Sequence, residues 1–283
     1  NSRFVKKGVT LLYIVATPIG NLGEITFRAV ETLKEADAVL CEDTRRTAVL
    51  LNKYGISKPL VSYQKFSEKE KAGYIVERLE KGENLALVSD AGMPLISDPG
   101  KVLVDELIAR GLEYTVISGP CALINAAVLS GMDVSSFCMC GFLPEKNSER
   151  KKFIGRFAAL TSTLIFYSPP HNVRKDLEFL FHALGARRAA VVREISKIHE
   201  EVVRGTLGDF PEFTEKGEFV IVTEGAPEKE SELNSLPIAA HVENYVGEGL
   251  SKMDAVKKAA ADRKMPKSAV YAEYEKYLKE DKQ

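Results

Sequence analysis

Short apolar segments alternate with amphipathic ones along the first half of the chain, and this alternation restricts the possible folds more than any other feature. Five apolar segments have the length and the Val, Ile and Leu content of buried parallel strands: Leu11–Ala16, Ala38–Cys41, Leu60–Tyr63, Leu85–Ser89 and Glu113–Ile117. Apolar residues at helical spacing separate the first two: Ile25, Ala29, Val30, Leu33 and Ala36. The alternation predicts an α/β fold in which helices cover a mostly parallel sheet.

The second half of the chain changes character twice. Residues 142–156 contain a proline, a cluster of charges and no periodicity, and we interpret them as an interdomain linker. Four further strands are then expected: Thr163–Tyr167, Ala189–Glu194, Glu201–Gly205 and Glu218–Thr223. From Pro237 the chain reads as helical. We therefore predict an N-terminal α/β domain over residues 1–141, a second α/β domain over 142–232 and a helical region over 233–283.

Composition excludes several function classes. The 283 residues carry a net charge of −1, so any contact with nucleic acid must depend on a local basic surface. The four cysteines form no C-x-x-C pair and no Cys/His cluster, so no metal site is expected. We expect them to be the reduced thiols of a cytoplasmic protein. No apolar run reaches the roughly 20 residues that span a bilayer, and the N-terminus lacks the apolar core of a signal peptide.

Three loops rich in glycine and proline directly follow expected strands, where ligands bind in open α/β sheets. They are Thr17–Asn21 (TPIGN), Ser89–Gly100 (SDAGMPLISDPG) and Ser118–Ala122 (SGPCA). Asp90 can accept hydrogen bonds from a ribose or an amino group, whereas Asp98, followed by Pro99, is more typical of a helix cap. Each loop alone is also compatible with an ordinary tight turn. Together they predict one ligand crevice.

Common nucleotide and hydrolase motifs are missing from the sequence. It has no G-x-G-x-x-G after the first strand, no G-x-x-x-x-G-K-[ST] and no G-x-S-x-G. A Rossmann dinucleotide site, a P-loop NTPase and an α/β-hydrolase therefore lose support.

Two charged segments also follow expected strands. In the first, Glu42 and Asp43 precede Arg45 and Arg46, whose guanidinium groups suit phosphate binding. The alternative is that Asp43 caps a helix and both arginines are solvated. The second segment, Arg193–Glu201, gathers a lysine, a histidine and three glutamates. It suits proton transfer, although a solvated charged turn is the simpler interpretation for any one of its residues.

These loops, together with Gly217–Gly225 (GEFVIVTEG), make the chain resemble the tetrapyrrole (corrin/porphyrin) methylase superfamily. Within the superfamily, CEDTRRT and REISKIHEEVVRGTL are similar to the ribosomal RNA small-subunit methyltransferase subgroup, which 2′-O-methylates a cytidine ribose in 16S rRNA. The resemblance runs from about Leu12 to Gly225. It implies a homodimer of two α/β domains, the second with a mixed sheet, that binds S-adenosylmethionine between them.

The resemblance also implies which residues contact S-adenosylmethionine. They come from the three loops and from two positions of the second domain: Pro18, Gly20, Asp90, Ala91, Gly92, Met93, Ile96, Ser118, Gly119, Pro120, Cys121, Ala122, Tyr167 and Glu218. Two departures from the family pattern stand out. The first loop is not the G-x-G-P-G type of tetrapyrrole-modifying relatives, which disfavours a porphyrin or corrin substrate. Residues 166–172 read FYSPPHN where the RNA subgroup has FYEAPHR-like sequences, so we assign no role to the two exchanged positions.

Methyl transfer to a ribose requires the hydroxyl to lose its proton. We expect Lys197 to lower the pKa of the hydroxyl and a carboxylate to accept the proton, with Glu42, Asp43 and Glu200 as candidates. The RNA contacts are expected at Arg45 and Arg46, at the charged cluster of 142–156 and in the tail, through Lys151, Lys152, Lys257, Lys258 and Lys264. A cap of solvated lysines is an equal alternative for the tail.

The expected partner is the 16S rRNA of the 30S subunit. Two rival functions remain at this stage. One is a tetrapyrrole C-methyltransferase, and the other is a non-catalytic ribosome assembly factor that has kept the cofactor cleft.

Overall fold

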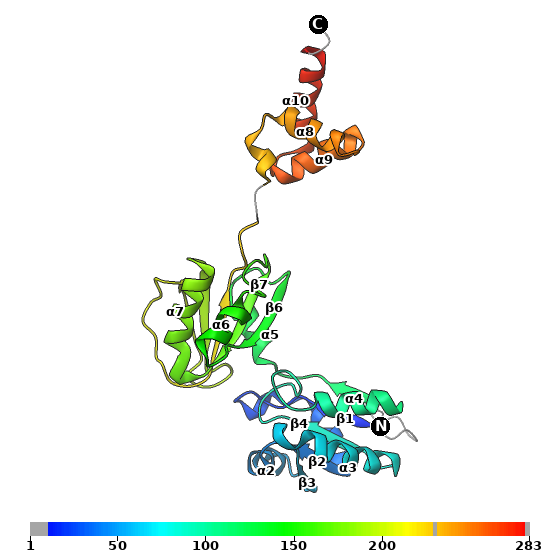
Figure 1. Cartoon of the computed structure of the whole chain (residues 1–283). Coiled ribbons are helices and arrows are strands. Elements are labelled where there is room, and N and C mark those ends of the chain that lie inside the picture. The colour runs from blue at the N-terminus through cyan, green and yellow to red at the C-terminus, as the bar shows by residue number, and fades with distance from the viewer. Residues whose placement is uncertain (1–10, 229–230, 281–283) are drawn as a thin grey trace. The chain divides into compact units, whose positions relative to one another are not determined.

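The computed structural model describes residues 11–228 and 231–280, which form two compact units; the first ends at Ala226 and the second begins at Pro227. The first unit contains two five-stranded sheets with helices on their faces, and the second unit is helical (Figure 1). The predicted α/β class with a helical C-terminal region is confirmed.

All pairings in the first sheet are parallel, and its order is β3-β2-β4-β1-β5. Its strands end within one residue of the predicted bounds: β1 Leu12–Val15, β2 Ala38–Cys41, β3 Leu60–Ser62, β4 Leu85–Val88 and β5 Tyr114–Ile117. Because parallel strands buried on both faces are apolar throughout, the Val, Ile and Leu runs located β1, β2 and β4 correctly, and the less buried edge strands β3 and β5 were also found.

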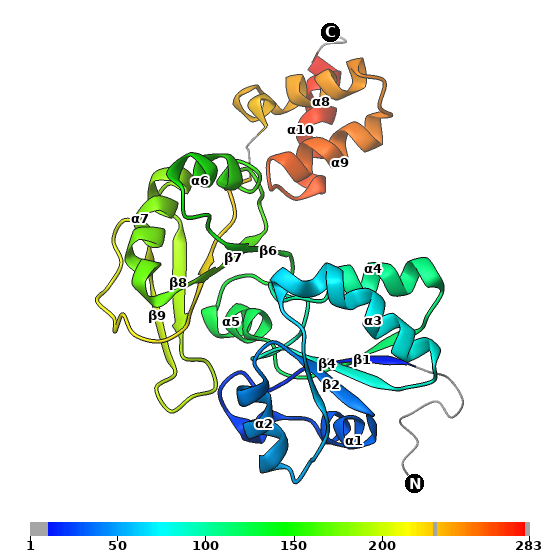
Figure 2. The ribbon, with the colours of Figure 1, turned by 60° about the horizontal axis from the view of Figure 1, so that its bottom comes forward.

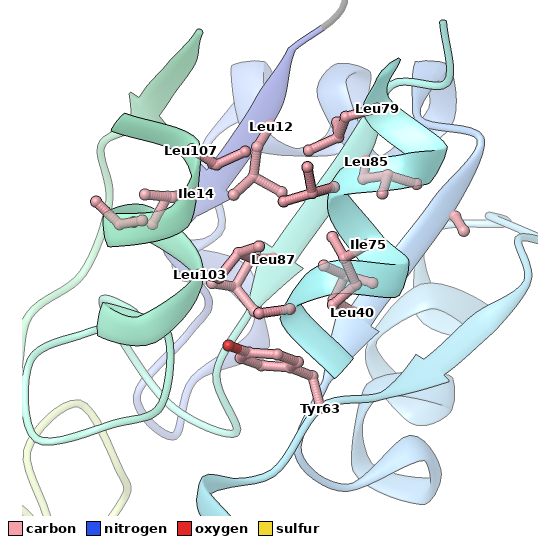
Figure 3. Close-up of a cluster of buried hydrophobic side chains, with 14 residues drawn as sticks. Leu12, Ile14, Leu40, Tyr63, Ile75, Leu79, Leu85, Leu87, Leu103 and Leu107 are labelled. Carbon is pink, nitrogen blue, oxygen red and sulfur yellow. The ribbon is translucent and has the colours of Figure 1, made fainter. Parts of the chain in front are cut away.

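Helices cover both faces of this sheet. Helices α3 (Glu68–Glu80) and α4 (Lys101–Arg110) cover one face, where they bury Leu12, Ile14 and Leu87 (Figure 3). Helices α1 (Phe27–Glu35) and α2 (Thr44–Lys53) lie on the other side, with the alternate residues of the same strands. The connections after β1 and β4 thus leave the sheet on opposite faces, the arrangement that opens a crevice beyond the carboxyl ends of the strands.

The second sheet is mixed, with the order β6-β7-β10-β8-β9. Its first two strands are parallel and its other pairings antiparallel: β6 Phe137–Phe142, β7 Thr163–Ser168, β8 Arg188–Arg193, β9 Glu201–Thr206 and β10 Phe219–Thr223. Strand β6 was not predicted. Its sequence, FCMCGF, lacks β-branched residues, it is an edge strand, and its register shifts between Met139 and Gly141.

The interpretation of residues 142–156 as a linker is wrong. Strand β6 ends at Phe142, and helix α6 (Asn147–Ile154) packs with α7 (Val173–Leu184) on the second sheet. The charge that suggested a linker is partly internal, because buried Arg150 donates to Asp176 Oδ1 at 2.7 Å. Strand β6 crosses the boundary placed after residue 141, and the three-part division stays a prediction.

Helix α5 (Ala122–Ser130) joins the two halves of the first unit. It starts at the end of the third glycine loop and packs on the face of the second sheet opposite α6 and α7 (Figure 2). Leu123 and Ala126 contribute to a core that contains Val192 and Val220. The third loop is therefore held between the end of β5 and a helix that belongs to the second sheet.

The second unit consists of η4 (Glu232–Ser235), α8 (Ile238–Gly247), α9 (Lys252–Asp262) and α10 (Lys267–Glu280). The three α-helices share a small apolar core. Fully buried His241 ties α8 to the end of α9, since its Nδ1 accepts from Arg263 Nε at 2.9 Å and its Nε2 lies 3.2 Å from Asp262 Oδ2. Residues 281–283 of the expected helical tail lie outside the described part. Within residues 11–228 and 231–280, no helix combines the length and apolarity needed to cross a membrane.

The buried pair Arg150–Asp176 gives a test of the second sheet's packing. Asp176 also accepts from Ser168 Oγ at 2.6 Å, so Asp176→Ala leaves a buried guanidinium and a buried hydroxyl without their acceptor. We expect a loss of about 3–5 kcal/mol in the free energy of unfolding, measured by urea denaturation. The exposed partner of Lys101 supplies the control, because Asp105→Ala should change it by less than about 0.5 kcal/mol. Equal effects of the two variants would contradict this account of the packing.

Candidate functional site

The first two glycine loops are joined by main-chain hydrogen bonds. Thr17 N donates to Gly92 O at 2.9 Å, and Gly92 N donates to Thr17 O at 3.1 Å. The Thr17 hydroxyl donates to Ser89 O at 3.1 Å. Gly92 has a φ of +82°, and a β-carbon there would come within 3.1 Å of Ile19, so both its conformation and its surroundings favour glycine.

The third loop lies against the first two. A β-carbon on Gly119 would come within 2.9 Å of Ala16 Cβ, and one on Gly92 would lie 3.6 Å from Pro120 O. Thr26 Oγ1 donates to Ser118 O at 3.5 Å. The structure thus brings all three sequence-selected loops together at the carboxyl ends of β1, β4 and β5.

A cavity of about 230 Å³ opens beside these loops. Its lining combines loop residues of the first sheet, one face of α2 and two charged residues of the second sheet. Seven of the predicted site residues line it: Pro18, Gly20, Arg46, Asp90, Ala91, Lys197 and Glu218. The other seven were not among the predicted contact residues: Thr17, Ile19, Leu22, Thr47, Val49, Leu50 and Ser89. Of these, Thr17, Ile19 and Ser89 belong to the predicted loops and Thr47 to the CEDTRRT motif. Some of these carry no distinctive signal, because the apolar residues of α2 fit an ordinary amphipathic helix.

Lys197 reaches from the second sheet into this cavity. Its Nζ lies 2.9 Å from Glu194 Oε1 and 2.8 Å from Glu218 Oε2. Its aliphatic stem covers Gly20, where a β-carbon would come within 2.5 Å of Lys197 Cγ, and Gly20 has a φ of +146°. Although desolvation acts the other way, the two carboxylates raise the pKa of Lys197, so the side chain is an ammonium at neutral pH.

The turn that carries Lys197 has unusual backbone angles. Glu194 and Ser196 have φ values of 49° and 69°, a conformation that non-glycine residues rarely adopt. Ser196 Oγ donates to Glu24 Oε1 at 2.6 Å, which fastens the turn to the first part of the chain. Glu200 is exposed, does not line the cavity, and accepts from Ser196 N at 2.7 Å. Glu200 therefore shapes the turn from outside the cavity.

Acidic side chains gather where β2 and β4 end. Desolvation, with Asp98 and Asp90 nearby, raises the pKa of Glu42 to about 7. Burial raises the pKa of Asp98 to about 6, despite a hydrogen bond with Ser89. Glu42 is half-buried and lies beside Asp90, which lines the cavity, although Glu42 itself does not. The site therefore combines an ammonium with a carboxyl group whose pKa is close to neutral pH.

The expectation that Asp98 caps the next helix is wrong. Helix α4 begins after Gly100, whose φ of 138° favours glycine. The Gly100 N–H donates to Glu68 Oε1 at 2.5 Å. Asp98 lies two residues earlier and turns inward instead. Because the acceptor for the start of the helix comes from a residue 32 positions away, local sequence could not reveal it.

The helix-cap alternative is confirmed for Asp43. It accepts from Arg45 N at 2.9 Å at the start of α2 and binds the Arg45 guanidinium at 2.8 and 3.1 Å. These hydrogen bonds lower the pKa of Asp43 to about 2. Arg46, mostly exposed, lies 3.3 Å from Asp90 Oδ2 at the cavity.

The remaining predicted cofactor contacts do not line this cavity. Met93 packs against the core of the first sheet, whereas Cys121, Ala122 and Tyr167 lie where α5 meets the second sheet. Burial raises the pKa of Tyr167 to about 12, with Cys121 and Asp98 among its ionisable neighbours. Tyr167 thus lies near both the second and the third loop. Roles for these residues, for Ile96 and for Ser118–Pro120 stay predictions.

The predicted RNA-binding lysines fall into two groups. Lys151 and Lys152 are exposed on α6. In the helical unit, Lys257 lies 3.4 Å from Asp254, Lys258 lies 3.9 Å from Glu248, and Lys264 lies 2.9 Å from Glu228. Since each of these three lysines has an acidic neighbour, the geometry favours the alternative of a solvated helical cap.

Comparison with known proteins supports one family. The sequence profile of Tetrapyrrole (Corrin/Porphyrin) Methylases matches residues 11–211. A "Ribosomal RNA small subunit methyltransferase I" of Halalkalibacterium halodurans is 42% identical over 271 residues, which cover 93% of this chain and 94% of that protein. The protein of the same name from Bacillus subtilis is 40% identical over 95% of each chain. That of Thermotoga maritima is 41% identical over 218 residues, which are 76% of this chain and 98% of that protein.

Solved structures with the same fold are more distant in sequence. A diphthine synthase superposes with a TM-score of 0.59 at 16% identity and covers 76% of this chain and 89% of its own. A uroporphyrin-III-C-methyltransferase from Thermus thermophilus gives a TM-score of 0.53 at 19% identity, over 75% of this chain and 94% of its own. These two likenesses concern the fold alone.

The raised pKa of Glu42 predicts a pH-dependent effect on stability. A carboxyl group whose pKa is higher in the folded than in the unfolded state destabilises the folded state as pH rises from about 4.5 to 7. Glu42→Gln should therefore gain about 1–2 kcal/mol relative to the unsubstituted protein between pH 5 and pH 8, after allowance for solvent screening. The free energy of unfolding at the two pH values measures this. Exposed Glu70 on α3 is the control, because Glu70→Gln should show no such drift. A pH-independent effect of Glu42→Gln would contradict the assignment.

Proposed function

Because this chain belongs to the tetrapyrrole (corrin/porphyrin) methylase family and is a methyltransferase, we propose that it transfers a methyl group from S-adenosylmethionine to ribosomal RNA. The proposed product is a 2′-O-methylated cytidine ribose in the 16S rRNA of the small subunit. One observation carries the proposal: the aliphatic stem of Lys197, from the turn after β8, lies over Gly20 of the first loop, and both residues line the same cavity.

The residues around the cavity fit S-adenosylmethionine, which when bound supplies a methyl group activated by a sulfonium. Asp90 and Glu218 offer carboxylates toward positive groups of such a ligand, and Arg46 offers a cation toward its carboxylate. The cavity of about 230 Å³ is smaller than the roughly 300–1,000 Å³ of most ligand sites. The rest of the ligand would therefore lie along Met93–Ile96, Ser118–Ala122 and Tyr167, where the other predicted contacts are.

The chain's own groups would divide the proton chemistry between them. The Lys197 ammonium would stabilise the developing alkoxide of the ribose. Glu42 is the better candidate for the proton acceptor, since a base works best when its pKa is close to the operating pH. Asp43, with a pKa of about 2, and Glu200, which holds the turn, are weaker candidates.

Exposed cationic and apolar groups near the cavity suit RNA. The side chains of Arg45 and Arg46 are 89% and 69% exposed. Phe66 is fully exposed in η2 (Lys65–Ser67), a turn held beside Glu42 because Gln64 Nε2 donates to Glu42 O at 3.1 Å. Unstacked bases commonly rest on such rings. The relatives that are 40–42% identical over nearly their whole lengths are named for methylation of small-subunit ribosomal RNA, which supports the proposed 16S rRNA substrate.

We extend the proposal to a cytoplasmic homodimer that acts on the 30S subunit. The face of β5 that carries Tyr114 and Val116 is exposed, and so are Ile124 and Val128 on α5. Such apolar surface suits a second copy of the chain. Since the family profile matches residues 11–211, which lie within the first unit, we assign the chemistry to residues 11–226.

Methylation of ribosomes lacking the modification tests the substrate. Unmodified 30S subunits incubated with the protein and tritiated S-adenosylmethionine should gain label in one 16S rRNA nucleotide, mapped by nuclease digestion. The label should survive base removal, because it is on the ribose. Naked 16S rRNA and a free tetrapyrrole are parallel substrates. Labelling of the tetrapyrrole alone, or binding to 30S subunits without methyl transfer, would overturn the proposal.

A substitution at Lys197 tests the proposed chemistry. Lys197→Met keeps the stem over Gly20 and removes the ammonium, so methyl transfer should fall by about 100-fold or more. The dissociation constant for S-adenosylmethionine, measured by calorimetry, should stay within about threefold. Exposed Lys216 in the same half of the unit is the matched control, and Lys216→Met should leave the rate unchanged. Normal turnover by Lys197→Met would remove Lys197 from the mechanism.

A further inference from the structure

A second cavity lies on the second sheet, outside the site described above. It has a volume of about 560 Å³ and opens between the start of α6, the short helix η3 (Pro170–Asn172) and α7. Its lining is strongly polar and includes two imidazoles, two side-chain amides and an aromatic ring: His171, His182, Asn147, Asn172 and Phe179. None of these residues takes part in the chemistry proposed above.

A buried arginine belongs to the wall of this cavity. Arg150 is 6% exposed, its Nε donates to Pro144 O at 2.7 Å, and its Nη2 donates to Asp176 at 2.7 Å. The guanidinium carbon lies 5.3 Å from the centre of the Phe179 ring. Its other terminal nitrogen, Nη1, has no partner among residues 11–228 and 231–280. Arg150 and Phe179 therefore give the cavity a rigid, preorganised side that keeps one strong donor free.

The η3 side of the cavity and the proposed active site lie at the same end of the second sheet. Strand β7 ends at Ser168, just before η3, and Ser168 pairs with Phe219, the first residue of β10. Phe219 pairs in turn with Arg193, the last residue of β8, so Glu218 and the turn with Lys197 leave the sheet at that end too. The ends of β7 and β8 are two strand spacings apart, or about 10 Å. One extended RNA strand could therefore reach both places.

The chemistry of the lining suits a nucleobase better than a phosphate. Side-chain amides and carboxylates pair with the donor and acceptor edges of bases, and imidazole or phenyl rings stack on base faces. Glu145 and Glu178 in the wall would repel a phosphate but can accept from an exocyclic amino group. Lys175 at the rim supplies a cation for the phosphate attached to that base.

We propose that this second cavity binds one unstacked nucleotide of the RNA substrate, near the nucleotide that is methylated. The inference rests on the proposed function for its RNA, but not on the chemistry at Lys197. It gives the exposed turn Pro170–Asn172 and the imidazoles of His171 and His182 a function in positioning RNA. Their contacts would contribute to binding in the ground state and the transition state alike.

Histidine ring signals provide a direct test, because the chain has four histidines. His171 and His182 line the second cavity, exposed His199 follows Lys197 and Ile198, and buried His241 belongs to the helical unit. We expect a short single-stranded RNA, and a mixture of nucleoside monophosphates at higher concentration, to shift the signals of His171 and His182. His171→Gln and His182→Gln assign the signals, and His241 is the internal reference.

Each outcome of the titration decides the inference independently of methyl transfer. Saturable shifts of His171 and His182 support the cavity even if 30S subunits are not methylated. Shifts confined to His199, or none, overturn the inference while leaving the proposed function intact. Inorganic phosphate is titrated in parallel, and equal shifts with phosphate alone would show an anion site and contradict recognition of a base.

Kinetics of full-length variants provide a second readout. Lys175→Ala and Asn172→Ala should each raise the KM for 30S subunits about three- to tenfold, with kcat and the affinity for S-adenosylmethionine unchanged. Lys101→Ala removes a lysine of similar exposure on α4 and should leave KM unchanged. A fall in kcat without a change in KM, or equal effects of Lys175→Ala and Lys101→Ala, would contradict a positioning function for the cavity.

Discussion

The placement of the Lys197 ammonium between Glu194 and Glu218, with its stem over Gly20, is the interaction on which the candidate site depends. It joins the turn after β8 to the loop after β1. The ion pairs fix the direction of the side chain, and the missing β-carbon at Gly20 makes room for it. Ser196 adds a hydrogen bond to Glu24 across the same junction. Because two sheets each hold one side of the cavity, its geometry follows from their packing rather than from any one loop.

The sequence predicted the parts of this arrangement that depend on residues close together in the chain. Buried parallel strands are continuously apolar, so β1, β2 and β4, and the loops at their carboxyl ends, could be located within one residue. The edge strands β3 and β5 are less buried, but their short apolar runs were located as closely. Strand β6 and helix α6 were missed because FCMCGF has weak strand character and one of the charged residues of α6, Arg150, turns inward to Asp176. The error at Asp98 has a similar cause, since the acceptor for α4 is Glu68, far away in sequence. Long-range polar pairs are what sequence patterns cannot show.

The candidate site residues divide in the same way. Gly20 and Gly92 could be recognised in the sequence, because few residues other than glycine tolerate their backbone angles. Charged residues are ambiguous until their partners are known. Asp43 and Glu42 are neighbours in sequence, yet one is a helix cap with a pKa of about 2 and the other a half-buried carboxyl with a pKa of about 7. Hydrogen bonds with Arg45 lower the pKa of Asp43, whereas desolvation beside other carboxylates raises that of Glu42.

The basic residues of the helical unit and those of the two cavities differ in how they could bind RNA. Lysines of the helical unit lie beside acidic residues, so their field is largely cancelled at short range, and screening by salt weakens what is left. Arg46 at the active cavity and Arg150 in the second cavity are held on rigid elements at one end of their sheets. Binding that depends on net charge would follow the number of free lysines, whereas binding in shaped cavities follows donor geometry. With a net charge of −1, the chain has little long-range attraction for RNA, and recognition by geometry is the more effective solution.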